Sequence, residues 1–305
     1  RGSGGAVTEL ALRAGALLAH RFHIVRCLGR GGVGEVYEGR DLGLRASLAL
    51  KLLRPALASD PLTAERFRRE VLLSRRVTHP NVCRIFDVFH HFDPLREEGE
   101  DPAPDVTFVT MELLPGETLD ERLRRRGPLP SQEALPLVAQ LASGLSAAHQ
   151  AGVIHRDFKS ANVMLVPSGD GDTRAVITDF GLARAVEAGE GATPPLTASG
   201  GMVGTFAYMA PEQVEGEEAT AAADIYALGL VMYEMVTGRR PFVGDSPLST
   251  AVKRLKEAPC SPRRYVPELD AHWEAAILRC LERDPARRFA RAEDVLSAVG
   301  GTTGA

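Results

Sequence analysis

A glycine-rich segment near the N-terminus constrains the fold of this chain more than any other feature. Residues 28–39 have the sequence LGRGGVGEVYEG, which contains the pattern Gly29-x-Gly31-x-x-Gly34. Two unrelated phosphate-binding structures share this pattern. One is a strand-to-helix turn in which the helix N-terminus holds a pyrophosphate, and the other is a strand-turn-strand flap whose backbone amides approach phosphate oxygens.

The residues after Gly34 favour the flap. Residues 35–39 are strand-like and end in a glycine, where the first structure requires a helix. That structure also needs an acidic residue about 20 positions on to close a strand, and here the strand ends in Lys51. We therefore expect a β-hairpin in this region. On this motif alone, a glycine-rich hairpin that binds nothing is an equally good interpretation.

Composition is ordinary for a protein with a large core. The chain has 305 residues, of which 44% are hydrophobic and 25% charged, which suits one large domain or two lobes. A net charge of -4 gives no bulk electrostatic reason to expect nucleic acid or anionic lipid as a partner. The four cysteines show neither disulfide nor zinc spacing, and no apolar run approaches the ~18 residues that span a bilayer, so we expect a cytoplasmic domain with reduced thiols.

Periodicity divides the chain into two parts. The first third is rich in strand-like segments around one amphipathic helix, at residues 63–77. Between two of these strands, residues 91–105 hold six acids, one arginine and three prolines, which predicts a solvated loop. After Pro115 helical patterns dominate. The predicted fold is α+β, with a small antiparallel β-sheet lobe that carries one main helix and a larger, mostly helical lobe.

The chain contains, in order, the groups that phosphoryl transfer requires: a phosphate flap, a cation for the phosphates, metal ligands and a group that orients the attacking hydroxyl. Lys51 follows the flap, and Glu70 lies on the one helix of the small lobe. The larger lobe contains VIHRDFKSANVML at 153–165, ITDFGLA at 177–183 and GTFAYMAPE at 204–212.

With these motifs, residues 22–298 resemble a eukaryotic-like (Hanks-type) protein kinase, most similar to bacterial serine/threonine kinases. The resemblance implies a bilobal kinase domain at 21–298, with the lobes at 21–112 and 113–298. Residues 1–20 are then a flexible segment that includes a tag, and 299–305 are the remnant of a linker. It also implies an ATP-dependent enzyme that phosphorylates protein serine and threonine hydroxyls, because Lys159 follows the catalytic aspartate by two residues.

The same resemblance assigns the catalytic roles. Asp157 corresponds to the carboxylate that orients or accepts the hydroxyl proton, and Lys159 to the cation beside the transferred phosphoryl group. Lys51 corresponds to the residue that aligns the α- and β-phosphates, with Glu70 as its ion-pair partner. Asn162 and Asp179 correspond to the ligands of Mg²⁺, for which Mn²⁺ is an alternative.

The remaining roles are implied in the same way. The predicted ATP pocket comprises Leu28, Gly29, Gly31, Gly34, Val36, Ala49 and Lys51, Met111 as gatekeeper, Glu112 and Leu114 in the hinge, and Leu165. His155 and Phe180 are packing residues, and Thr205 lies in the small loop before the Ala-Pro-Glu motif. Glu212 should pair with Arg288, and Asp224 should hold the backbone of the catalytic loop, since a buried charge is tolerated only when it is paired.

Thr197 and Ser199 stand at the spacing of autophosphorylation sites in the resembling kinases, and Arg156 could receive a phosphate there. The family also includes membrane-anchored proteins and dimers that form through the small lobe, so we keep a homodimer among the expected partners. Two alternatives are a catalytically inactive pseudokinase that acts as a scaffold and a small-molecule kinase. The first usually lacks Lys51, Asp157 or Asp179, which are all present here.

Overall fold

The computed structural model describes residues 12–30, 34–53, 61–91, 106–169, 171–180 and 207–300. The chain divides into two compact units. The first, the sheet unit, comprises residues 1–64 and 85–113, and the second, the helical unit, comprises 65–84 and 114–305. Residues 65–84, which include most of the helix at Pro61–Ser74 (α2), thus group with the helical unit.

The sheet unit is a six-stranded antiparallel sheet with the strand order β1-β2-β3-β4-β6-β5. Its strands are β1 (Leu17–Leu18), β2 (Phe22–Arg30), β3 (Gly34–Asp41), β4 (Ala46–Leu53), β5 (Ile85–His91) and β6 (Val106–Met111). The glycine-rich segment therefore connects two paired strands, so the predicted β-hairpin is confirmed. Gly34 has to be a glycine, because a Cβ there would lie 1.8 Å from the Leu52 carbonyl oxygen.

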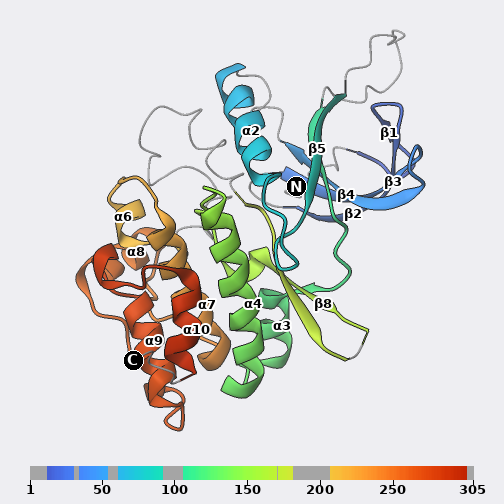
Figure 1. Ribbon diagram of the computed structural model, residues 1–305. Helices are drawn as coiled ribbons and strands as arrows, with labels where there is room; N and C mark the ends of the chain where they lie inside the picture. The colour runs from blue at the N-terminus through green and yellow to red at the C-terminus, as the bar shows by residue number, and fades with distance from the viewer. Residues whose placement is uncertain are drawn as a thin grey trace, which may run out of the picture. The chain divides into compact units, whose positions relative to one another are not determined.

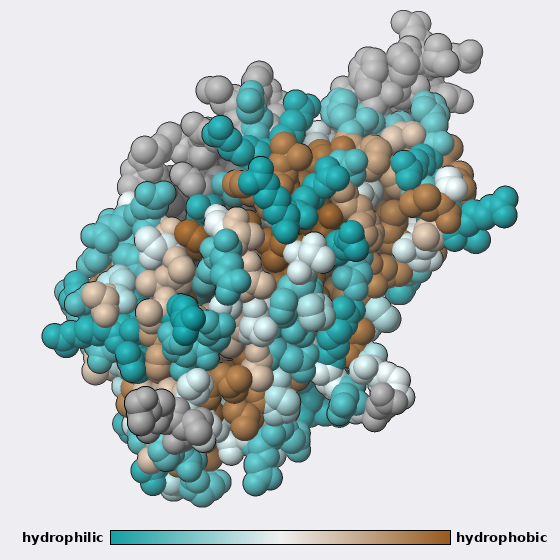
Figure 2. All heavy atoms as spheres, viewed as in Figure 1, coloured by the Kyte–Doolittle hydropathy of each residue, from teal (hydrophilic) through white to brown (hydrophobic). Residues whose placement is uncertain are grey.

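Aromatic side chains form the centre of this unit's core. Phe22, Phe89 and Phe108 meet with ring centroids 4.8 to 5.6 Å apart, a spacing at which aromatic pairs attract. Other apolar side chains remain exposed on the unit, and Figure 2 shows brown atoms gathered over it. The most exposed are Leu17, Val25, Leu42, Leu44 and Phe86, each more than 40% accessible.

The helical unit contains longer helices and a three-stranded sheet with the order β7-β8-β9. The strands are β7 (Glu117–Thr118), β8 (Val163–Pro167) and β9 (Thr173–Ile177). The helices are α3 (Leu119–Arg126), α4 (Ser131–Gln150), α6 (Pro211–Val214), α7 (Ala221–Thr237), α8 (Pro247–Lys256), α9 (Ala271–Cys280) and α10 (Ala292–Val299). Helices α4, α7, α9 and α10 pack side by side (Figure 1).

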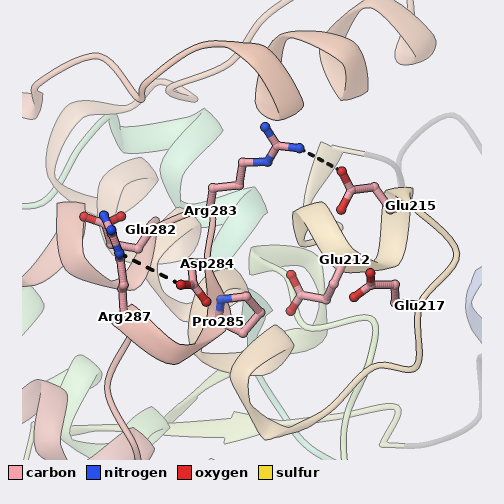
Figure 3. A pocket seen from close by; sticks show the side chains of 8 residues that line it. All are labelled: Glu212, Glu215, Glu217, Glu282, Arg283, Asp284, Pro285 and Arg287. Atoms are coloured by element: carbon pink, nitrogen blue, oxygen red, sulfur yellow. Dashed lines mark hydrogen bonds and ion pairs between the residues drawn. The ribbon is translucent and has the colours of Figure 1, made fainter.

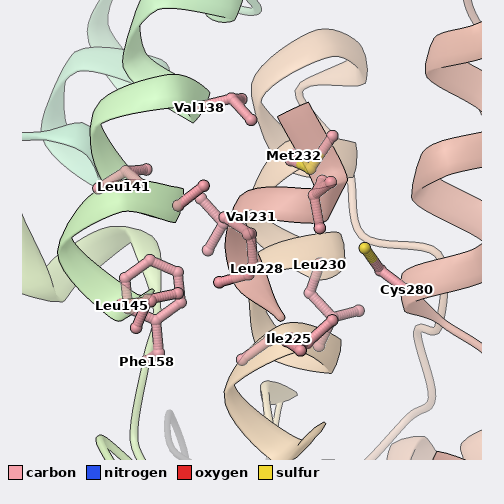
Figure 4. Close-up of a cluster of buried hydrophobic side chains, with 14 of the residues drawn as sticks. Val138, Leu141, Leu145, Phe158, Ile225, Leu228, Leu230, Val231, Met232 and Cys280 are labelled. Carbon is pink, nitrogen blue, oxygen red and sulfur yellow. The ribbon is translucent and has the colours of Figure 1, made fainter. Parts of the chain in front are cut away.

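Helix α7 is the centre of the helical unit. All its residues from Ala223 to Thr237 are buried, which is typical of a helix that is apolar on every side. Figure 4 shows its side chains meeting those of α4, with Cys280 of α9 on the opposite side. The helices approach closely at Gly229, where a Cβ would lie 2.5 Å from the Cβ of Cys280. Within the described ranges, no helix combines the length and apolarity needed to cross a membrane.

Candidate active site

The loop between α4 and β8 brings two predicted catalytic residues and one predicted metal ligand together. The Lys159 ammonium donates hydrogen bonds of 2.9 and 2.7 Å to the two carboxylate oxygens of Asp157. The Asn162 amide donates a 2.8 Å hydrogen bond to the Asp157 carbonyl, and its side chain is buried. A carboxylate, a cation and an amide oxygen therefore lie within one turn of chain, because Ser160–Asn162 form a short 3-10 helix.

The backbone of this loop is held by the carboxylate of Asp224, which α7 places in the core. Its Oδ2 accepts hydrogen bonds from the His155 amide at 2.7 Å and from His149 Nε2 at 2.8 Å. Its Oδ1 accepts from the Arg156 amide at 2.8 Å, where φ is +66°. A residue other than glycine is held in this conformation only when its surroundings fix it, and Asp224 supplies that constraint.

His155 is fully buried and both of its ring nitrogens are engaged. Nε2 donates to the Thr178 carbonyl at 2.8 Å, and Nδ1 accepts a 3.3 Å hydrogen bond from the Asp157 amide. The ring lies 4.6 Å from that of Phe180 and 5.6 Å from that of Phe158, between centroids. These contacts are those of a packing residue rather than of a base that exchanges protons with a substrate.

The two predicted metal ligands, Asn162 and Asp179, are joined through the backbone. Thr178 immediately precedes Asp179, and its amide donates a 2.9 Å hydrogen bond to the Asn162 carbonyl. Asp179 has a φ of +66°, so backbone strain again coincides with a predicted functional residue. A carboxylate and an amide oxygen suit Mg²⁺, a hard cation that takes its other ligands from water and phosphates, so this donor pair fits the metal.

Glu70 has a partner in the helical unit that the sequence did not predict. One of its carboxylate oxygens lies 3.5 Å from Nη1 of Arg156, and both side chains are largely buried. From the sequence, the expected partner of Arg156 is a phosphate and that of Glu70 is Lys51. Because Lys51 belongs to the other unit, the structure adds a contact of Glu70 without testing the predicted pair.

Several of the predicted nucleotide-binding residues lie opposite one another on paired strands of the sheet unit. Val36 is opposite Lys51 in the β3–β4 pairing, and Ala49 is opposite Met111 in the β4–β6 pairing. Lys51 is 4% exposed. Leu28, Gly29, Gly34 and Glu112 also lie in the sheet unit, and Leu114 and Leu165 lie in the helical unit. Gly31, Thr197, Ser199 and Thr205 lie outside the described residues.

The ion pair that the sequence predicts between Glu212 and Arg288 is present in the structure. The guanidinium of Arg288 donates to both carboxylate oxygens, at 2.7 and 2.8 Å, and its side chain is completely buried. Three backbone carbonyls accept its remaining hydrogen bonds, at 2.8 to 3.1 Å. The pair fixes the start of α6 against the segment between α9 and α10.

A cavity of about 360 Å³ opens beside this pair (Figure 3). Two of its acidic groups are paired within the wall, since Arg283 bonds to Glu215 at 2.9 Å and Arg287 lies 3.9 Å from Asp284. None of the residues predicted to contact ATP or to act on the substrate lines it. We therefore assign this cavity no part in the chemistry.

One buried network was not anticipated from the sequence. The hydroxyl of Tyr208 lies 2.9 Å from Oγ of Ser160 and donates a 2.5 Å hydrogen bond to Glu234. Burial next to Glu234 raises the pKa of Tyr208 well above its usual value, so the phenol stays protonated. These residues stand inside the YMAPE, FKSAN and YEM segments, and only their proximity in the fold reveals that they interact.

Comparison with known proteins identifies the family. Residues 22–298 match the protein kinase domain, so the chain belongs to that family. The predicted bilobal kinase fold is therefore confirmed, and the comparisons do not support the pseudokinase alternative.

The named relatives are serine/threonine-protein kinases. The chain is 37% identical over 279 residues to the serine/threonine-protein kinase PknB of Mycobacterium tuberculosis, which covers 91% of this chain and 42% of the relative. It is equally identical over 277 residues to PknA of the same organism, with 91% and 60% covered. The crystal structure of the PknI kinase domain of Mycobacterium tuberculosis superposes with a TM-score of 0.71 at 28% identity, covering 96% of this chain and all of that one. The chain thus spans less than two thirds of the length of these curated relatives.

Proposed function

We propose that this domain transfers the γ-phosphate of ATP to serine or threonine hydroxyls of protein substrates. The observation that carries the proposal is the cluster of Asp157, Lys159 and Asn162 on a loop whose backbone is fixed by the buried Asp224. Because phosphoryl transfer depends mainly on positioning and electrostatic stabilisation, a rigid loop with these groups suits it.

The proposed reaction assigns one task to each side chain. The carboxylate of Asp157 accepts the proton of the substrate hydroxyl while the hydroxyl oxygen bonds to the γ-phosphorus of ATP. The bond between the γ-phosphorus and the oxygen that bridges it to the β-phosphate breaks, and ADP leaves. Lys159, now bonded to Asp157, would stabilise negative charge on the transferred group. Asn162 and Asp179 would hold Mg²⁺, which supplies the charge that neutralises the phosphates.

Transfer to a protein in the presence of Mg-ATP is the direct test. Wild-type protein should phosphorylate a generic basic protein and leave a panel of aminoglycosides unmodified. Asp157→Asn should lower kcat by about 10²- to 10⁴-fold, the usual contribution of a positioned base. Lys51→Met should abolish turnover and keep the fold, and Glu215→Gln, at an exposed ion pair, is the matched control that keeps full activity. Wild-type rates in Lys51→Met or Asp157→Asn would refute the proposal, as would modification of the aminoglycosides alone.

The proposal includes self-modification of Thr197 and Ser199. Its support is the composition of that segment and the position of Arg156, directly before Asp157. In the structure Arg156 contacts Glu70, so a phosphate would have to compete with that carboxylate. Mass spectrometry after incubation with Mg-ATP should find phosphate within residues 193–199, and an unmodified segment would contradict this part of the proposal.

Two finer expectations stay predictions. Mg²⁺ is the expected metal and Mn²⁺ the alternative, because both cations accept oxygen donors of this kind. The exposed apolar side chains of the sheet unit agree with dimerisation through the small lobe, which sedimentation of a Leu44→Asp variant would test.

A further inference from the structure

Arg254 is a buried cation, although its place in the sequence suggests an exposed side chain. It lies in the basic segment VKRLK at the end of α8, where a charged side chain normally faces solvent. Its neighbour Lys256 is exposed, and yet Arg254 is only 2% accessible. Burial lowers the pKa of Arg254, an unfavourable effect that its contacts have to offset.

Those contacts are directed at one short piece of backbone. Nη1 donates a 2.6 Å hydrogen bond to the Met209 carbonyl, and Nη2 donates a 2.7 Å hydrogen bond to the Ala207 carbonyl. The guanidinium also lies 5.7 Å from the ring centroid of Phe242, within the range of a cation–π contact. The planar, forked geometry of arginine allows it to bind two carbonyls at once, which a lysine cannot do in the same way.

The two carbonyls belong to the residues on either side of Tyr208, and the Tyr208 side chain is bound by a different part of the chain. Its hydroxyl lies 2.9 Å from Oγ of Ser160, the residue after Lys159 in the catalytic loop. The segment 207–209 is thus bound through its backbone by α8 and through its side chain by the catalytic loop. This arrangement fixes the distance between that segment and Asp157.

We propose that Arg254 is a positioning residue for phosphoryl transfer, which holds the segment 207–209 against the catalytic loop and thereby sets the path of the substrate polypeptide to Asp157. The inference rests on the proposed function. A protein substrate whose hydroxyl reaches Asp157 has to pass along the residues next to this loop, and 207–209 are bonded to it. None of the residues assigned to ATP lies in this segment, so the two substrates should respond differently to its displacement.

Steady-state kinetics of Arg254→Met and Arg254→Lys test the proposal. Arg254→Met should lower kcat/KM for the protein substrate about ten-fold or more, since small misplacements of a docked substrate are costly, and leave the KM for ATP unchanged. Arg254→Lys keeps the positive charge but cannot bind two carbonyls in the same way. Its kcat/KM for the protein substrate should therefore lie between those of Arg254→Met and wild type. Lys256→Met, on the same helix and exposed, is the matched control with wild-type kinetics. An equal loss of kcat/KM for ATP and for the protein substrate, or no loss for either, would overturn the proposal.

Hydrogen exchange gives a second readout that does not depend on turnover. In Arg254→Lys, and in Arg254→Met if it folds, amides in 207–216 and 156–163 should exchange faster, with α9 unchanged. Changes confined to α8 would overturn the inference even if activity fell. A wild-type protein that transfers no phosphate would refute the proposed function instead, and the exchange comparison would still decide whether Arg254 fixes 207–209 against the loop.

Discussion

The buried ion pair between Glu212 and Arg288 permits a quantitative prediction. In Glu212→Gln, the guanidinium of Arg288 stays completely buried and loses the charge that compensates it. Removing one partner of a buried pair typically costs about 3–5 kcal/mol. Three carbonyls and the new amide oxygen still accept hydrogen bonds from Arg288, so we expect a loss near the lower limit, about 3 kcal/mol in the free energy of unfolding.

The single tryptophan provides the assay. Trp273 is buried in α9, so its fluorescence during denaturant unfolding reports on the helical unit alone. A loss of about 3 kcal/mol should lower the melting temperature by roughly 6–12 °C, at 2–4 °C per kcal/mol for a domain of this size.

The chain offers a matched control in the same cavity wall. Glu215 pairs with Arg283 at 2.9 Å, but both side chains are exposed, so Glu215→Gln should cost only about 0–1 kcal/mol. The double variant Glu212→Gln/Arg288→Met removes the buried charge that Glu212→Gln leaves without a carboxylate, and it should be more stable than Glu212→Gln alone. If Glu212→Gln and Glu215→Gln cost the same, or if the double variant restores nothing, the reasoning about buried charge is refuted.

Three further predictions concern metal binding, pH and a helix cap. Asp179→Asn should weaken Mg-dependent ATP binding in calorimetry, whereas Asp157→Asn should bind ATP like wild type; equal losses would show that the two roles are misassigned. Burial lowers the pKa of His79 below its usual value, so the unfolded chain binds the proton more readily and stability should fall as the pH drops below about 6.5. His79→Asn should lessen this decline in denaturant titrations, and His23→Asn, at an exposed position, should leave it unchanged. If wild type and both variants lose stability equally with falling pH, His79 is not its source. Thr118 caps α3 by accepting a hydrogen bond from the Glu121 amide, so Thr118→Ala should cost about 1 kcal/mol by the same fluorescence assay, and a loss below 0.3 kcal/mol would exclude a contribution from the cap.

The local elements of this fold were predictable because their signals are contained within short stretches of chain. The hairpin around Gly34 follows from a strand-like sequence on both sides of the glycines, and the structure pairs these strands antiparallel, with two register shifts between Ile24 and Gly29. The helical patterns after Pro115 likewise predict a mostly helical lobe, and the structure has the helix α7 there, at Ala221–Thr237. The pairing of Glu212 with Arg288, 76 residues apart, came only from the family resemblance, since nothing in the spacing of two charges identifies them as partners.

The buried polar contacts of Arg254 and Tyr208 escaped prediction for a physical reason. Arg254 and Glu234 belong to segments whose composition suits either a solvated or a buried side chain, and only tertiary packing decides between the two. Tyr208 shows the same difficulty, because its partners Ser160 and Glu234 come from a loop and a helix distant in sequence. No pattern of period 2 or 3.6 records such contacts.

Arg156 illustrates how a correct motif can leave a contact undetermined. Its position before Asp157 suggested a receptor for a phosphate, and its left-handed backbone, bonded to Asp224, directs the side chain independently of any phosphate. In the structure that side chain meets Glu70 at 3.5 Å. A carboxylate carries one negative charge, and a phosphorylated side chain carries about 1.5 to 2 and offers three acceptor oxygens. A phosphate that reached Arg156 would therefore be the stronger partner and would displace the Glu70 carboxylate.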